Sequence, residues 1–168
     1  RHGADPSLST AALPRDITAL PPSAPGMRIG LFGGSFNPAH EGHRLVSREC
    51  LKRLELDAVW WLVTPGNPLK DHSAPAPLEA RVAAARALIS SPRERVTGFE
   101  TARGFTYTYQ TLSHLRQTMP DRKFVWIMGA DSLATFHHWE RWQEIFMLMP
   151  VAVYVRPGST RKAIASRA

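Results

Sequence analysis

The sequence has a single cysteine, Cys50, and no long run of apolar residues. One thiol cannot form an internal disulfide, so a disulfide-stapled scaffold is excluded and a reducing cytoplasm is the expected location. No segment approaches the roughly 20 consecutive apolar residues that span a bilayer. Residues 1–26 also lack the continuous apolar stretch of a signal peptide. We therefore expect no membrane partner.

Several signatures of ligand and catalytic sites are missing as well. The sequence contains neither the dinucleotide fingerprint G-x-G-x-x-G nor the phosphate loop G-x-x-x-x-G-K-S/T. It also lacks the zinc-protease pattern H-E-x-x-H and the G-x-S-x-G elbow of serine hydrolases. Any phosphate, metal or nucleophile chemistry of this protein must therefore use other residues.

The composition is that of one globular domain with a flexible arm. The chain has 168 residues, of which 43% are hydrophobic. Five of the 14 prolines lie in residues 1–26, so we expect a flexible Pro- and Ala-rich leader there and a domain over residues 27–168. The formal net charge of +7 fits a phosphate-rich partner, either a nucleotide or a nucleic acid.

Short β-rich runs alternate with longer amphipathic runs from Met27 onward. The pattern predicts strands at 27–32, 58–64, 95–100, 123–129 and 151–156. Helices are expected at 42–55, 78–89, 106–119 and 139–148. This alternation predicts an α/β fold with a doubly wound parallel sheet, in which ligands bind beyond the carboxyl ends of the strands.

The stretch "GGSFNPAHEGHR" begins at Gly33, directly after the first predicted strand. Gly33 and Gly34 can take a positive φ and let backbone N–H groups approach a ligand. His40 and His43 are three residues apart where the chain enters a helix, so both rings can lie on one side, beside the positive helix end. Two imidazoles in that place suit an anion such as phosphate.

Zinc binding and nucleophilic catalysis are the alternatives for this stretch. No nearby Cys or further His offers a third zinc ligand at a recognised spacing, and a helix N-terminus disfavours a cation. Ser35 lies in no nucleophile elbow, and Cys50 falls in the apolar stripe of a predicted helix. We interpret both side chains as structural and expect no metal site formed by protein ligands.

The stretch "FGGSFNPAHEGH" resembles the Thr/His-x-Gly-His signature of the nucleotidylyltransferase superfamily. Its form is typical of bacterial nicotinate mononucleotide adenylyltransferases, and the similarity continues through "PGNPLK", "FTYTYQTL", "MGADSLATFHHW" and "VYVRPG", covering residues 27–158. The resemblance implies a Rossmann-like nucleotidylyltransferase fold. It also implies adenylyl transfer from ATP to nicotinate mononucleotide, which gives nicotinate adenine dinucleotide and pyrophosphate in NAD biosynthesis.

The resemblance assigns roles to individual residues. The catalytic residues are His43 and His40, which contact phosphates; no protein base is required, because the attacking phosphate is already anionic. The ATP-binding positions are Gly33, Gly34, Ser35, Phe36, Lys70, Gly129 and Asp131. Two ordinary interpretations stay open: Lys70 as a solvated lysine and Asp131 as the N-cap of the next helix.

Other positions match the mononucleotide site, which comprises Tyr107, Thr108, Trp139 and Arg156. Trp139 matches an aromatic residue that stacks on the pyridine ring, although Trp139 and Trp142 could instead form an ordinary core pair on one helix. Mg²⁺ is implied as a cofactor, held mainly by the phosphates of ATP and by water. The substrates are thus ATP and nicotinate mononucleotide, with no nucleic-acid partner.

The sequence departs from the family pattern at its end. The Ile-Ser-Ser/Thr-Thr-x-x-Arg segment that normally follows the last strand is missing from "RPGSTRKAIASRA". We therefore expect a domain that lacks this phosphate-binding segment. Alternative functions are transfer to nicotinamide mononucleotide or phosphopantetheine, and a non-catalytic basic module that binds nucleic acid; the last lacks any recognised nucleic-acid motif.

Overall fold

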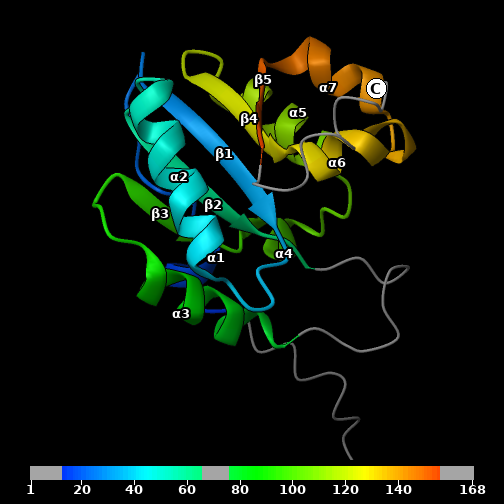
Figure 1. Ribbon diagram of the computed structural model, residues 1–168. Coiled ribbons are helices and arrows are strands. Elements are labelled where there is room, and N and C mark those ends of the chain that lie inside the picture. Colours follow the sequence, from blue (N-terminus) through cyan, green and yellow to red (C-terminus); the bar gives the residue numbers. More distant parts are fainter. Residues whose placement is uncertain (1–12, 66–75, 156–168) are drawn as a thin grey trace, which may run out of the picture.

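The computed structural model describes residues 13–65 and 76–155, which form a five-stranded parallel sheet flanked by helices (Figure 1). The strands are β1 (Arg28–Gly34), β2 (Ala58–Val63), β3 (Glu94–Thr97), β4 (Lys123–Gly129) and β5 (Val151–Tyr154). Their order across the sheet is β3-β2-β1-β4-β5. This is the doubly wound α/β fold predicted from the sequence. Every residue of β2 is buried, because both faces of the sheet are covered.

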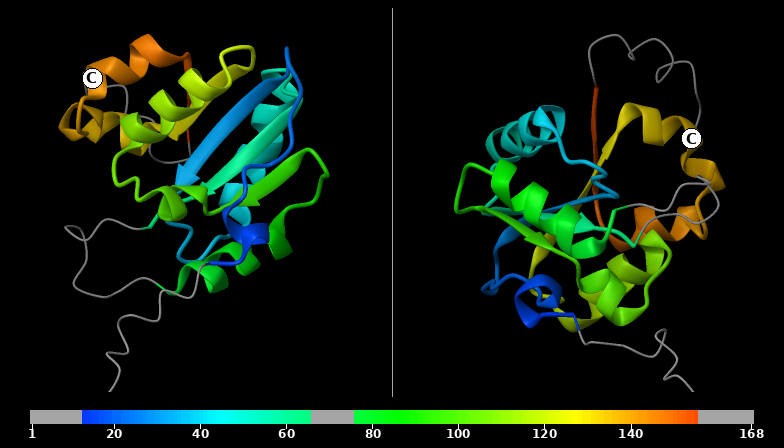
Figure 2. Two further views of the ribbon diagram at one scale, coloured as in Figure 1. Left: turned by 180° about the vertical axis from the view of Figure 1, so that it is seen from behind. Right: turned by 90° about the horizontal axis from the view of Figure 1, so that it is seen from below.

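The helices divide between the two faces of the sheet (Figures 1 and 2). Ile17, Cys50 and Val82 place three helices against one core: α1 (Arg15–Thr18), α2 (Glu41–Arg53) and α3 (Leu78–Leu88). The other core contacts α4 (Phe99–Arg103), α5 (Thr108–Thr118), α6 (Ala130–Thr135), the 3₁₀ helix η2 (Phe136–His138) and α7 (Trp142–Leu148). None of the helices in the described part of the chain is long and apolar enough to cross a membrane.

The connections of the sheet fix where a ligand can bind. After β1 the chain moves to β2 and β3 on one side, and then returns to β4 and β5 on the other. β1 therefore lies between β2 and β4, and the strand order reverses at β1. In such a sheet the crevice for ligands opens beyond the carboxyl ends at the reversal. The ends of β1 and β4, Gly34 and Gly129, lie there.

The structure differs from the predicted elements at three places along the chain. β3 ends at Thr97 rather than 100, because Gly98 begins the short helix α4. The helices α6 and η2 were not predicted as separate elements. The helix expected at 139–148 begins only at Trp142, because Arg141 has a φ of 53° that no regular helix contains.

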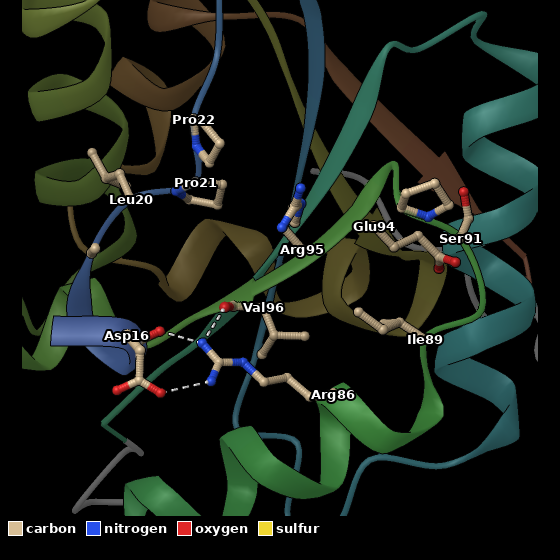
Figure 3. Close-up of a pocket in the computed structure, with 12 residues that line it drawn as sticks. Asp16, Leu20, Pro21, Pro22, Arg86, Ile89, Ser91, Glu94, Arg95 and Val96 are labelled. Carbon is tan, nitrogen blue, oxygen red and sulfur yellow. Dashed lines mark hydrogen bonds and ion pairs between the residues drawn. The ribbon is translucent and has the colours of Figure 1, made fainter. Parts of the chain in front are cut away.

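Residues 13–26 correct the expectation that all of residues 1–26 form a flexible leader. Ile17 is 8% exposed, and its carbonyl accepts a hydrogen bond of 2.7 Å from the N–H of Gly98. The Arg86 side chain bonds Asp16 and the carbonyl of Val96, as Figure 3 shows. This segment therefore packs beside the edge strand β3. Residues 1–12 lie outside the described residues.

Candidate active site

The end of β1 and the loop that follows it are shaped by close packing more than by glycine flexibility. A Cβ on Gly33 would lie 2.4 Å from Cη2 of Trp126, so the indole on β4 requires a glycine there. Neither Gly33 nor Gly34 has a positive φ, contrary to the sequence interpretation; the residue that does is Phe36, with a φ of 46°. A bulky residue with this left-handed backbone conformation is unfavourable unless surrounding contacts stabilise it.

The side chains of His40 and His43 both accept hydrogen bonds from backbone N–H groups at the start of α2. The Nδ1 atom of His40 accepts a hydrogen bond from the N–H of Gly42 at 3.1 Å. The Nδ1 atom of His43 accepts one from the N–H of His40 at 3.0 Å. A neutral imidazole whose Nδ1 accepts must carry its proton on Nε2. Both rings, whose centroids are 3.9 Å apart, therefore carry an Nε2–H donor.

The glycine between the two histidines has a steric reason. A Cβ on Gly42 would lie 2.9 Å from Cε1 and 3.0 Å from Nδ1 of His40. His40 can therefore fold back over the first turn of α2 only because Gly42 has no side chain. The spacing His-x-Gly-His is thus explained by local packing at the helix start.

The His43 ring lies in a box of aromatic side chains. Its centroid is 4.9 Å from that of Phe36, 6.0 Å from Phe32 and 6.4 Å from Trp61. Phe36 stacks on Trp61 with the ring centroids 5.2 Å apart. Sequence reasoning assigned neither Phe32 nor Trp61 to the site, and their place in the apolar strands gave no distinguishing signal.

A series of buried hydrogen bonds fixes one of the aromatic rings around His43. The indole N–H of Trp61 donates to Oγ of Ser47 at 2.9 Å, and that hydroxyl donates to Oε2 of Glu94 at 2.6 Å. The other oxygen of Glu94 accepts from the N–H of Ser90 at 3.2 Å. Because each of these polar atoms has a partner, the series can lie in the core and fix the orientation of Trp61.

Arg81 of α3 is the other site residue that sequence reasoning missed. It is 4% exposed, and its guanidinium donates to the carbonyls of Ser35, Thr64 and Ala76. Burial lowers the pKa of Arg81 from its ordinary value. The signal was its helical spacing: Arg81 lies on the same side of α3 as the buried residues Leu78 and Ala85. We call residues 33–43, together with Trp61 and Arg81, the β1–α2 corner.

Tyr107 and Thr108 lie where the resemblance implied, at the start of a helix. Tyr107 is the N-cap of α5, and Thr108 is its first residue. The side-chain oxygen of Gln110 accepts from the N–H groups of Thr106 and Tyr107 at 2.8 and 2.9 Å. The N–H groups of the first helical residues have no acceptor within a helix, so this helix start can bind an anion. Its first turn contains no acidic residue.

Trp139 follows η2 and is half-buried. Its ring packs against Phe136 at a centroid distance of 5.0 Å and against Trp126 at 6.4 Å. Trp126 also contacts Gly33, so this indole joins Trp139 to the β1–α2 corner. The core-pair interpretation is wrong in one respect, because Trp139 and Trp142 do not share a helix. We call residues 105–109 and 136–142 the α5–α7 corner.

Two further predicted positions, Gly129 and Asp131, lie at the junction of β4 and α6. Gly129 ends β4, where a Cβ would lie 3.1 Å from the Tyr154 ring. Asp131 is exposed in the first turn of α6, but the N-cap is Gly129, so the N-cap interpretation of Asp131 is wrong. Lys70 and Arg156 lie outside the described residues.

Neither thiol chemistry nor a protein-built metal site is visible in the described part of the chain. Burial, followed by the charge of Glu49, raises the pKa of Cys50 to about 11, which keeps the thiol protonated near neutral pH. Cys50 is 8% exposed and packs in the core, in agreement with its interpretation as structural. Residues 13–65 and 76–155 contain no group of three or more His, Cys, Asp or Glu side chains that could bind a metal.

The chain is similar to known proteins of one family. The family model described as cytidylyltransferase-like matches residues 31–167. A protein of Methylorubrum extorquens (strain PA1) named "Probable nicotinate-nucleotide adenylyltransferase" is 64% identical over 142 residues, covering 84% of this chain and 77% of that protein. A protein of Rhizobium johnstonii with the same name is 51% identical over 148 residues, covering 88% and 74%.

Solved structures show the same fold. The nicotinic acid mononucleotide adenylyltransferase of Plasmodium falciparum complexed with NaAD aligns with a TM-score of 0.60 and 15% identity, covering 83% of this chain and 80% of that one. At that identity the likeness supports the fold alone, and the assignment rests on the sequence relatives. This chain belongs to the cytidylyltransferase-like family of nucleotidyltransferases and, within it, groups with the nicotinate-nucleotide adenylyltransferases.

Proposed function

We propose that this protein transfers the adenylyl group of ATP to nicotinate mononucleotide, forming nicotinate adenine dinucleotide and pyrophosphate in NAD biosynthesis. The observation that carries the proposal is the pair His40 and His43, whose Nδ1 atoms are occupied by backbone N–H groups. That arrangement puts two Nε2–H donors beside the N-terminus of α2, where negative charge is favoured. The cytoplasm is the location that fits a metabolic enzyme with a single cysteine.

The chemistry requires positioning and charge stabilisation more than proton transfer. A phosphate oxygen of the mononucleotide forms a bond to the α-phosphorus of ATP, and the bond from that phosphorus to the bridging oxygen of the β-phosphate breaks. Pyrophosphate leaves with the electron pair. The Nε2–H groups of His40 and His43 donate to phosphate oxygens, and their hydrogen bonds strengthen as negative charge grows on those oxygens. Gly33, Gly34, Ser35 and Phe36 form the adjoining wall.

Mg²⁺ belongs to this proposal as a companion of ATP. The described residues of the β1–α2 corner provide N–H donors and aromatic rings, and carboxylates that would bind a metal directly are not grouped there. A small hard cation is therefore held by phosphate oxygens and water, as is common for nucleotide enzymes. When bound, Mg²⁺ neutralises charge on the phosphates; Lys70 is proposed to reach the same group.

The α5–α7 corner supplies the mononucleotide site in this proposal. Trp139 offers an aromatic face to the pyridine ring, and the start of α5 at Tyr107 and Thr108 offers backbone N–H groups to its carboxylate. A carboxylate suits these N–H groups better than an amide, because the helix end favours a negative charge. Asp131, in the first turn of α6, is a proposed contact for the ribose, and Arg156 is a proposed contact for the mononucleotide phosphate.

A pyrophosphate-release assay with ATP and Mg²⁺ tests the proposal. Nicotinate mononucleotide and nicotinamide mononucleotide are compared as acceptors, with phosphopantetheine as a third. We expect release with the acid at a kcat/KM at least about tenfold above that with the amide. Equal rates with acid and amide would remove the acid preference, and release with none of the three acceptors would reject the function.

A further inference from the structure

Arg81 stands out among the buried side chains because its positive charge has no carboxylate beside it. It is 4% exposed, and none of the ion pairs within the described residues includes it. A buried charge is unfavourable unless hydrogen bonds compensate it. In this case three backbone carbonyls supply the compensation.

The three carbonyls come from three separate segments that meet at the carboxyl end of the sheet. Nη1 of Arg81 donates to the carbonyl of Ser35, after β1, at 3.0 Å and to that of Thr64, after β2, at 2.6 Å. Nε donates to the carbonyl of Ala76, before α3, at 2.7 Å. The N–H of Ala76 in turn donates to Oδ1 of Asn37 at 3.3 Å. Arg81 therefore joins the loop that precedes His40 to its two neighbouring segments.

The bond to Ser35 fixes the direction of the next amide. In a trans peptide the carbonyl and the following N–H point in opposite directions, so a Ser35 carbonyl held by Arg81 turns the Phe36 N–H away from α3. Phe36 has the positive φ of 46°, which a bulky residue adopts only when its surroundings impose it. No backbone carbonyl within residues 13–65 and 76–155 accepts a hydrogen bond from the Phe36 N–H.

We propose that Arg81 is a positioning residue for ATP: it holds the Ser35–Phe36 peptide in the orientation in which the Phe36 N–H donates to a phosphate. Arg81 itself does not touch the nucleotide. The inference rests on the proposed adenylyl transfer and adds a residue outside the signature motif to it. Three rigidly spaced donors are required, and a lysine ammonium on a flexible stem cannot replace a planar guanidinium in that role.

Arg86 provides a matched control on the same helix. It also joins separate segments, because it donates to the carbonyls of Asp16 and Val96 and pairs with the Asp16 carboxylate (Figure 3). Those partners belong to α1 and β3, and neither is part of the loop after β1. Arg81→Lys and Arg86→Lys therefore remove comparable tethers, only one of which reaches the site.

The test measures KM for ATP, KM for nicotinate mononucleotide and the melting temperature of both variants. For Arg81→Lys we expect KM for ATP to rise about tenfold, equivalent to about 1.4 kcal/mol. KM for the mononucleotide should change by less than about twofold, since only ATP loses an interaction. Arg86→Lys should lower the melting temperature and leave both KM values unchanged. An unaltered KM for ATP in Arg81→Lys, or an equal rise in Arg86→Lys, would overturn the inference.

A measurement on the unmodified protein covers the case in which Arg81→Lys does not fold. In ¹⁵N-labelled protein, the Phe36 amide proton should shift on saturation with ATP and Mg²⁺, whereas the amide of Gly98, beside Ile17, should not. A Phe36 resonance that stays in place at saturation would overturn the inference. Because this experiment reports ATP binding alone, it separates a failed role for Arg81 from a failed adenylyl transfer, which only the turnover assay detects.

Discussion

The two corners of the site are held by different kinds of interaction. The β1–α2 corner is held by buried hydrogen bonds: the bonds from Arg81 to backbone carbonyls and the chain from Trp61 through Ser47. The α5–α7 corner is held mainly by ring contacts, with Trp139 against Phe136 and an exposed pair in which Arg141 lies 4.6 Å from the Tyr109 ring centroid. Exposed pairs contribute little to stability. The β1–α2 corner, which we propose binds the phosphates, is therefore preorganised, and the α5–α7 corner, which we propose binds the mononucleotide, is more adaptable.

This difference has a chemical reason. The charge that develops in phosphoryl transfer is stabilised best by donors that do not move during the reaction, because reorganising them would cost free energy at that moment. A pyridine ring is bound largely by contact area and stacking, which tolerates small displacements. Substitutions in the β1–α2 corner should accordingly affect kcat or KM for ATP, whereas substitution of Trp139 in the α5–α7 corner should affect KM for the mononucleotide.

The largest expected effect comes from removing the His43 ring. His43→Ala should lower kcat by about 100-fold or more, as the loss of one transition-state donor does, and change KM for ATP by less than about threefold. His43→Asn is the informative companion, since its side-chain oxygen can still accept from the N–H of His40. Both variants should be slow by the pyrophosphate assay. Turnover close to the parent rate in either variant would contradict the role of the Nε2–H.

Gly42→Ala should give the next largest effect. The new Cβ would lie 2.9 Å from Cε1 of His40 and would displace that ring. Because a small displacement of a catalytic group misaligns it with the reacting phosphate, we expect kcat to fall by about 30-fold. Stability should stay within about 1 kcal/mol of the parent, because alanine favours a helix more than glycine does. The measurements are pyrophosphate release and the urea midpoint. A fall in stability with normal kcat would show that Gly42 serves folding alone.

Trp139→Ala should produce a smaller effect of another kind. Loss of the ring face should raise KM for nicotinate mononucleotide by about five- to tenfold, the equivalent of about 1–1.5 kcal/mol of aromatic stacking. KM for ATP should not change. Trp142→Ala, at a neighbouring tryptophan that also packs on Phe136, is the control and should lower stability without that selectivity. If both variants raise the two KM values equally, the two corners are not independent.

Glu100 gives the smallest effect, which concerns stability. Burial raises its pKa from 4.5 to about 7, although the hydrogen bond from Thr111 opposes the shift. The folded protein therefore keeps a proton that the unfolded chain loses between those pH values, and the stability contribution falls as pH rises. From pH 5.5 to 6.5 the parent should lose about 1 kcal/mol relative to Glu100→Gln in urea unfolding. Parallel pH profiles would show that Glu100 ionises normally.

Sequence reasoning predicted the β1–α2 corner better than the α5–α7 corner. His40 and His43 were expected at the start of a helix, and Tyr107 and Thr108 at the start of another; the structure confirms both placements. The helix predicted over 139–148 instead begins at Trp142, because the positive φ of Arg141 breaks the pattern. No feature of the local sequence marks that break. In the fold, Arg141 lies 4.6 Å from the Tyr109 ring centroid and pairs with Glu144.

The sequence by itself determined the doubly wound fold class and the place of the paired imidazoles at a helix start, because apolar periodicity and a capping interaction act between residues close along the chain. Only the tertiary structure decided that Arg81 would hold Ser35 and Thr64, or that Trp126 would require glycine at position 33. Those contacts join residues far apart in the sequence. They exist only after the strands have aligned, since close packing, which no local pattern encodes, selects them.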